Sequence, residues 1–215
     1  MKCKICELRK PRRHCPGIQA DICSICCGNE REVSINCPLE CVYLQEARAH
    51  EKHIQVDQAK LANSDVEVTE SFLTRHKELM LFIGFSLAEA ALKSSGVVDA
   101  DVREALDSLT RTYRSLSSGI YYDSRPVNPY AAEVYTSMQS SIAEIQAEAK
   151  KNSGSIRDAE LLALLVTYQR LALSMDNGRP KGRSFINGML SQFPIQAKEP
   201  PEAGRLIEPG RLIEL

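Results

Sequence analysis

The sequence predicts an all-α protein: a helical bundle of about five long helices with a small N-terminal two-zinc module and an extended C-terminal tail. Three observations lead to this prediction. All eight cysteines lie between Cys3 and Cys41, apolar residues recur at helical spacing through the middle of the chain, and proline, glycine and glutamate dominate beyond Pro194. We therefore divide the 215 residues into a cysteine-rich zinc module (1–41), a helical bundle (42–193) and a tail (194–215).

The spacing of the cysteines is typical of metal coordination. In each of two C-x-I-C turns, a short loop can aim both thiolates at one ion while its backbone N–H groups bond to the sulfurs. Closed structural zinc sites have four ligands, so eight thiolates predict two all-thiolate Zn²⁺ sites. We expect the first ion to bind Cys3, Cys6, Cys23 and Cys26, and the second to bind Cys15, Cys27, Cys37 and Cys41.

The two predicted sites are interleaved along the chain. Because adjacent side chains point in different directions, Cys26 and Cys27 should serve different ions and connect the two sites through the backbone. Cys37 precedes Pro38, which is a favoured first residue of a helix, and Cys41 would lie on the same face of that first turn. The second site is then expected to clamp the module onto the first long helix. His14 offers an alternative ligand to Cys15, although an exposed loop histidine is the simpler interpretation.

Other uses of the cysteines remain open at this point. Disulfides need an oxidising compartment, and the chain begins Met1-Lys2-Cys3 without an apolar signal segment, so we expect it in the reducing cytoplasm. An iron–sulfur cluster also takes four thiolates, and spacing alone does not distinguish it from zinc. Redox use of a C-x-x-C turn normally comes with a βαβ pattern, which this sequence lacks.

Helical periodicity and capping residues set the expected helices after the module. The first is amphipathic, the second and fifth are apolar almost all round, and glycines separate several of them. Thr69 or Ser71 can start the second helix, and Asp99 or Asp101 can cap the third. The five long helices are predicted over residues 38–62, 69 or 71 to 94, 99 or 101 to 119, 130–151 and 155–176, followed by a short helix over 185–193.

The segment from Ile120 to Pro129 interrupts this pattern. Its two prolines cannot continue a helix, and it carries Tyr121 and Tyr122 next to each other. Such a segment either plugs the bundle or forms a recognition surface. We expect it to plug the bundle, because tyrosine rings bury much apolar area while their hydroxyls reach a polar partner.

Two groups of cations are candidate anion or partner contacts. The second group precedes the short helix, whose free N–H groups would also attract an anion. An equally good interpretation is that these cations pair with acidic side chains or with helix C-termini. The two groups are Arg9, Lys10, Arg12 and Arg13, and Arg179, Lys181 and Arg183.

Charge and hydropathy exclude some classes of function. The net charge is −1 and the pI is about 6.4, so no general basic field would recruit nucleic acid. Residues 1–41 carry seven Lys or Arg and five Asp or Glu, and eight thiolates with two Zn²⁺ would bring this +2 segment to −2. No run approaches 18 apolar residues, so we expect no membrane span.

Several blocks of sequence resemble a known group of proteins. They are C-K-I-C, C-S-I-C-C-G-N-E-R-E-V, C-P-L-E-C-V-Y-L, S-G-I-Y-Y-D (Ser118 to Asp123) and N-G-R-P-K-G-R (Asn177 to Arg183). They resemble a group of uncharacterised bacterial proteins, and the resemblance touches most of the chain without implying an activity. The interleaved cysteines are also similar to cross-brace fingers of the MYND and HIT type, which mostly bind proteins. The gaps here differ, with Cys26 and Cys27 adjacent and no final histidine.

These observations favour a non-catalytic protein. The sequence has no glycine-rich phosphate loop, nucleophile elbow or H-E-x-x-H motif, and two saturated ions would keep no position open for water. We expect a cytoplasmic zinc-binding interaction or regulatory protein that binds a protein partner. The alternatives are a nucleic-acid-binding protein that uses the two basic groups, and an iron–sulfur sensor. The duplicated G-R-L-I-E in the tail, at 204–208 and 210–214, could add a strand to a partner's sheet.

Overall fold

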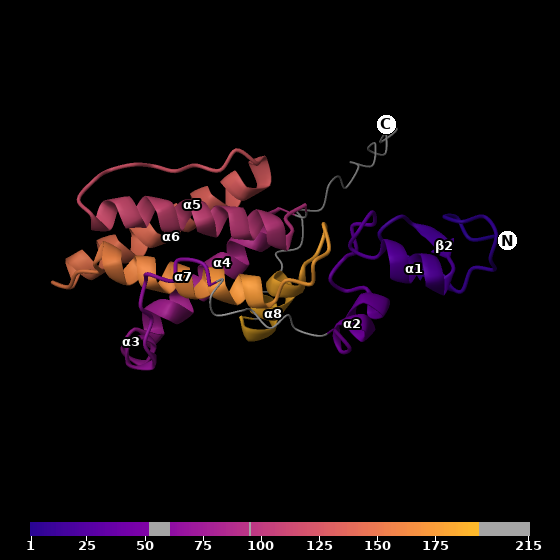
Figure 1. Ribbon diagram of the computed structural model, residues 1–215, viewed down its shortest axis with the longest axis horizontal. Coiled ribbons are helices and arrows are strands. Elements are labelled where there is room, and N and C mark those ends of the chain that lie inside the picture. The colour runs from indigo at the N-terminus through magenta and orange to yellow at the C-terminus, as the bar shows by residue number, and fades with distance from the viewer. Residues whose placement is uncertain (52–60, 95, 194–215) are drawn as a thin grey trace, which may run out of the picture.

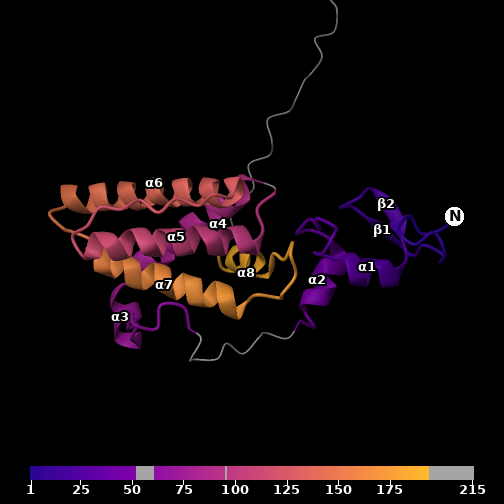
Figure 2. The same ribbon diagram turned by 45° about the horizontal axis from the view of Figure 1, so that its top comes forward.

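The computed structural model describes residues 1–51, 61–94 and 96–193. Within these ranges it contains eight helices and one two-stranded sheet, so the prediction of a mostly helical protein is confirmed. The cysteine-rich segment lies at one end of the molecule and the long helices at the other (Figure 1). Helix α8 lies at the end of the helical part that faces the cysteine-rich segment, as Figure 2 also shows. No helix in the described ranges is long and apolar enough to span a bilayer.

A small hairpin and two short helices form the N-terminal end. Strand β1 (Arg13–Cys15) pairs antiparallel with β2 (Ala20–Ile22), with Cys15 opposite Ala20. Helix α1 (Ser24–Glu30) follows at once, and Cys23 caps it because its sulfur accepts a hydrogen bond from the N–H of Cys26. Helix α2 (Val42–Arg48) completes this end.

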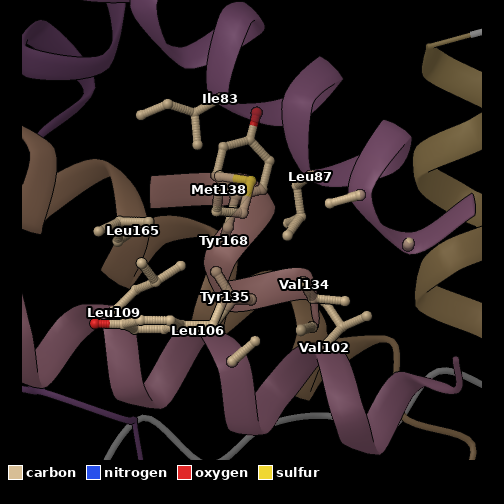
Figure 3. Close-up of a cluster of buried hydrophobic side chains, with 14 of the residues drawn as sticks. Ile83, Leu87, Val102, Leu106, Leu109, Val134, Tyr135, Met138, Leu165 and Tyr168 are labelled. Atoms are coloured by element: carbon tan, nitrogen blue, oxygen red, sulfur yellow. The ribbon is translucent and has the colours of Figure 1, made fainter. Parts of the chain in front are cut away.

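The long helices share one apolar core. Helix α5 packs against both α6 and α7, while α4 packs against α6, α7 and α8. Figure 3 shows side chains from four helices meeting in this core, among them Ile83, Leu106, Met138 and Leu165. The helices of this part are α3 (Glu70–Arg75), α4 (Lys77–Lys93), α5 (Asp99–Ser117), α6 (Pro129–Lys151), α7 (Asp158–Ser174) and α8 (Ser184–Gln192).

Two predicted helices are wrong in part. The first was expected from Pro38, but α2 begins at Val42 with Cys41 as its N-cap, and it ends at Arg48; residues 52–60 lie outside the described residues. The N–H of Cys41 bonds to the carbonyl of Pro38, so this segment forms a turn rather than the first turn of a helix.

The second predicted helix is divided into α3 and α4. At His76 the backbone leaves the helical conformation (φ −103°, ψ 24°), and the imidazole packs on the ring of Phe72 with the centroids 4.5 Å apart. Among the described residues, the helices longer than ten residues are therefore α4, α5, α6 and α7.

The expectation that Tyr121 and Tyr122 plug the bundle is wrong. Their relative exposures are 80% and 64%, so both rings lie on the surface. Tyr135 of α6 is a buried tyrosine, and its hydroxyl donates to the carboxylate of Asp123 and so ties the loop to the core. A second bond, from the N–H of Ser124 to Thr112 Oγ1 (3.0 Å), fixes the loop on α5.

Asp99 caps a helix distant in sequence. We expected Asp99 or Asp101 to cap α5, and the carboxylate of Asp101 does accept the N–H of Val98 (2.8 Å). The buried carboxylate of Asp99 instead accepts the N–H groups of Phe185 (2.9 Å) and Ile186 (3.1 Å) at the start of α8. Burial outweighs these two bonds and raises the pKa of Asp99 to about 6.

The raised pKa of Asp99 predicts a pH dependence of stability. The folded state retains the Asp99 proton up to about pH 6, whereas the unfolded chain loses it near 3.8. The Asp99 contribution to the free energy of unfolding is therefore greatest below pH 3.8 and falls, by at most about 3 kcal/mol, as the pH rises through 6. Wild type should therefore lose stability relative to Asp99→Asn as the pH rises over this range, as measured by denaturant titration of both proteins at several pH values. Titration of the thiols affects both proteins alike and cancels in the comparison.

A difference in the free energy of unfolding that stays constant or rises with pH would contradict this prediction.

Candidate metal centre

Four of the predicted ligands lie close together. The sulfurs of Cys3, Cys6, Cys23 and Cys26 all lie within 4.8 Å of one another, as expected for the first ion. Cys3 and Cys6 come from the N-terminal turn, while Cys23 and Cys26 come from the start of α1. The hairpin between the two pairs brings the turns together, since the N–H of Lys4 bonds to the carbonyl of Asp21 (3.1 Å) in β2.

Backbone N–H groups point at these sulfurs. Cys3 Sγ accepts the N–H of Cys23 (3.2 Å), and Cys23 Sγ accepts the N–H of Cys26 (3.4 Å) at the positive end of α1. Burial opposes ionisation of Cys3, but the N–H donors of Cys6 and Cys23 help to outweigh it and lower its pKa to about 6. The same kind of donor, from Cys26, lowers the pKa of Cys23. Two of the four thiols are thus prepared to bind a cation as thiolates.

The remaining electrostatics also favour a bound cation. Burial, together with the neighbouring thiols of Cys23, Cys6 and Cys3, raises the pKa of Cys26 to about 12. A divalent ion would balance the negative charge of neighbouring thiolates, so all four cysteines could bind it as thiolates. Arg9 lies beside Cys23, which raises the pKa of the Arg9 guanidinium and offsets part of the negative charge of the site. A buried set of four thiolates fits a tetrahedral structural ion.

The second predicted set is less closely gathered. Among the described residues, only the first set brings three or more metal-binding groups within 4.8 Å of one another. Burial raises the pKa of Cys37, and negative charge on Cys15 and Cys41 acts in the same direction. The fourth, Cys27, accepts hydrogen bonds from Arg13 Nη1 (3.4 Å) and Arg31 Nη2 (3.9 Å).

Glu32 joins the cysteine-rich segment to the long helices. Its side chain is fully buried, and Oε1 accepts from Arg48 Nη2 (2.9 Å) and from the N–H of Arg183 (3.0 Å). Oε2 accepts from Asn177 Nδ2 (3.0 Å). The backbone contributes as well, because the carbonyl of Glu32 accepts the N–H of Lys181 (2.8 Å) and its N–H bonds to the thiol of Cys37.

The second group of cations lies in the same interface. Arg179 Nη1 donates to the carbonyls of Gly28 (3.4 Å) and Arg31 at the C-terminal end of α1, and Lys181 Nζ donates to the carbonyl of Ser34 (2.6 Å). Arg183 Nε donates to the carbonyl of Val97 (2.8 Å). Arg179 therefore meets the C-terminal end of α1, as the second interpretation expected, whereas Lys181 and Arg183 bind carbonyls of loop residues.

The loop that carries these cations can reach the module because of Gly182. A Cβ at this position would collide with the side chain of Asn177 and lie 3.0 Å from the carbonyl of Arg179. Gly182 therefore allows the loop to close tightly enough to place Asn177 beside Glu32.

The first group of cations is divided between internal and exposed positions. Arg13 lies over the ring of Tyr43, with its guanidinium carbon 4.4 Å from the ring centroid. Arg9, Lys10 and Arg12 are exposed. His14 is also exposed, as expected, but it lies in β1 rather than in a loop, with Nδ1 3.0 Å from Oδ1 of Asp21 in β2.

Comparison with known proteins yields no relative. No family model matches this chain, and neither the curated proteins nor the solved structures contain a match. The function must therefore be argued from the geometry of the chain itself.

The interface role of Glu32 and the capping of α8 by Asp99 were not predicted from the sequence. Both are acidic residues in polar segments, and nothing in the local pattern marks either as buried. The available signal was the set of blocks quoted for the resemblance, because C-S-I-C-C-G-N-E-R-E-V and N-G-R-P-K-G-R meet each other at Glu32.

Loss of one ligand of the first site should remove one ion. In the full chain dialysed against a chelator, Cys26→Ser is expected to lower the metal content by one equivalent per chain relative to wild type, because three thiolates hold the ion less tightly than four. Elemental analysis of the purified proteins measures this, with the exposed Ser24→Ala as a control on the same helix turn. An unchanged metal content in Cys26→Ser would contradict the assignment.

Removal of the buried carboxylate should separate the module from the long helices. Glu32→Ala leaves the buried Arg48 guanidinium without its counter-ion, and such losses cost about 3–5 kcal/mol. Chemical denaturation should show this decrease in the free energy of unfolding, or an early separate transition for the N-terminal end. The exposed Glu40→Ala is the matched control and should change stability little. If the two variants are equally stable, Glu32 does not hold the interface.

Proposed function

We propose that this chain is a non-catalytic, cytoplasmic zinc-binding interaction protein, in which a zinc-stabilised module fixed to a helical domain supports binding of a protein partner. The observation that carries the metal part is the buried group of Cys3, Cys6, Cys23 and Cys26. Four thiolates saturate a zinc ion, so such a site stabilises a fold and offers no position for an attacking water.

The second ion belongs to the same proposal. Charge on Cys15 and Cys41 affects the thiol of Cys37, and Cys27 follows Cys26 directly, so a second Zn²⁺ would draw these four sulfurs together. Because the N–H of Glu32 bonds to Cys37, this ion would also order the residue that joins the module to the long helices. An iron–sulfur cluster is the alternative occupant, and visible absorbance of the purified protein distinguishes the two.

The partner-binding part rests on the loop from Ile120 to Val127. It exposes four large apolar side chains, and hydrogen bonds hold it in place, from the N–H of Ser124 to α5 and from α6 to the carboxylate of Asp123. A surface that is apolar and already ordered loses little conformational entropy on binding, which favours a protein interface. The four exposed side chains are Ile120 (64%), Tyr121 (80%), Tyr122 (64%) and Val127 (95%).

Nucleic-acid binding is the second candidate, and the contacts of the cations weigh against it. Phosphates would have to replace the carbonyls that Arg179 and Lys181 already bind. In the first group, Arg9, Lys10 and Arg12 are exposed, while Arg13 is half-buried and donates to Cys27 Sγ. Three exposed cations give a small electrostatic contribution to phosphate binding, and the Cys23 thiol beside Arg9 offsets part of it.

The exposed tyrosines should matter for partner capture and not for folding. Tyr121→Ser with Tyr122→Ser is expected to change the free energy of unfolding by less than about 1 kcal/mol, because both rings lie on the surface. The same variant should lose the proteins that copurify with the wild-type chain, as quantified by mass spectrometry. Leu8→Ser removes an equally exposed apolar side chain (80%) from the module and should keep them.

Two results would contradict the proposed function. One is equal partner capture by the tyrosine variant and by wild type. The other is a DNA or RNA mobility shift that weakens steeply with salt, which would favour the nucleic-acid alternative.

A further inference from the structure

A groove between α4 and α6 has the shape and charge to hold a short peptide. Its volume is about 530 Å³, and its lining includes the small side chains of Ala90 on α4 and Ala132 on α6. Lys93 of α4 and Glu133 of α6 also line it, and both are exposed.

We propose that this groove binds the duplicated R-L-I-E segment of the chain's own C-terminal tail. The two copies are Arg205 to Glu208 and Arg211 to Glu214. They belong to residues 194–215, which lie outside the described part of the chain and are attached to Phe193.

The charges of the segment match those of the groove. Each copy places an arginine before, and a glutamate after, a Leu-Ile pair. With the Leu-Ile pair against Ala90 and Ala132, the arginine can reach Glu133 and the glutamate can reach Lys93. Lys93 Nζ already donates to Ser137 of α6 (2.8 Å), which holds its ammonium over the groove with further donors to spare.

The tail begins close enough to reach the groove. The ring of Phe193, the last described residue, lies against Gly84 of α4. Ala90 is six residues further along the same helix, a rise of about 9 Å. Arg205 follows Phe193 by twelve residues, which span up to about 40 Å when extended. Either copy can therefore enter the groove of its own chain.

Covalent attachment favours this occupant over a separate molecule. A tethered segment meets its site at an effective concentration in the millimolar range when the linker spans the distance. Two equivalent copies compete for one groove, so one copy is bound while the other extends from the surface. The proposal is independent of the metal centre and of the tyrosine loop.

The absence of tryptophan from the sequence gives a direct test. Ile207→Trp places a single fluorophore in the first copy, and Leu212→Ser with Ile213→Ser inactivates the second. In the full chain we expect blue-shifted emission and severalfold weaker acrylamide quenching than for Val127→Trp, a fully exposed reference position (95%). A companion protein with the roles of the two copies exchanged should behave alike.

A variant that fills the groove should release the probe. Thr136→Arg adds a large side chain to the groove lining and should restore the quenching of the exposed reference. Ala143→Arg, two turns along α6 and outside the groove, should leave the probe protected. Exchange of the rim charge in Lys93→Glu should weaken docking by about twofold to fivefold, as for an exposed ion pair, and Glu208→Lys should restore it.

Three outcomes would overturn the proposal. The first is a probe that is fully quenchable in the parent protein. The second is protection that survives Thr136→Arg, because the segment then binds elsewhere. The third is protection that disappears on dilution, because the occupant of the groove is then the tail of another copy.

Discussion

The burial of the Glu32 carboxylate is the constraint on which the arrangement of the molecule depends. A charged group without water must find partners, or its desolvation costs several kcal/mol. Its partners come from α2 and from the loop 177–183, which lie 16 and about 150 residues away in sequence. Because these partners are available only when the N-terminal end rests on the loop before α8, one carboxylate sets the position of the cysteine-rich segment relative to the long helices.

The same residue connects metal binding with helix packing. Its N–H bonds to Cys37, and its side chain and carbonyl bond to the loop that leads into α8. Asp99 then fixes the other side of that helix start by capping Phe185 and Ile186. A chain of hydrogen bonds thus runs from the thiols through Glu32 to α8, and from α8 to the start of α5. The steps from Glu32 to the loop and from Asp99 to α8 join segments far apart in sequence.

The parts of the structure that depend on local sequence could be predicted. The C-x-I-C spacing places Cys3, Cys6, Cys23 and Cys26 around one point, because each turn is short and geometrically restricted. Helices α5 and α6 follow from their apolar stripes and caps within about two residues.

The parts that depend on distant partners could not be predicted. Asp99 has the sequence of an ordinary cap for α5, and only the fold brings the start of α8 next to it. Tyr121 and Tyr135 are chemically alike, yet the core has room for the second, since it belongs to the buried face of α6. The break at His76 falls within an unbroken helical pattern, so periodicity gave no sign of it.

The long separation between Glu32 and its partners affects the order of events during synthesis. At about 5–20 residues per second, roughly 8–30 seconds pass on the ribosome between the addition of Glu32 and that of Arg183. During this interval the cysteine turns and Arg48 have already been made, while the carboxylate still has water as its main partner. Cation capture by the nascent N-terminus can therefore precede its docking, and the finished loop then encloses a segment that is already shaped.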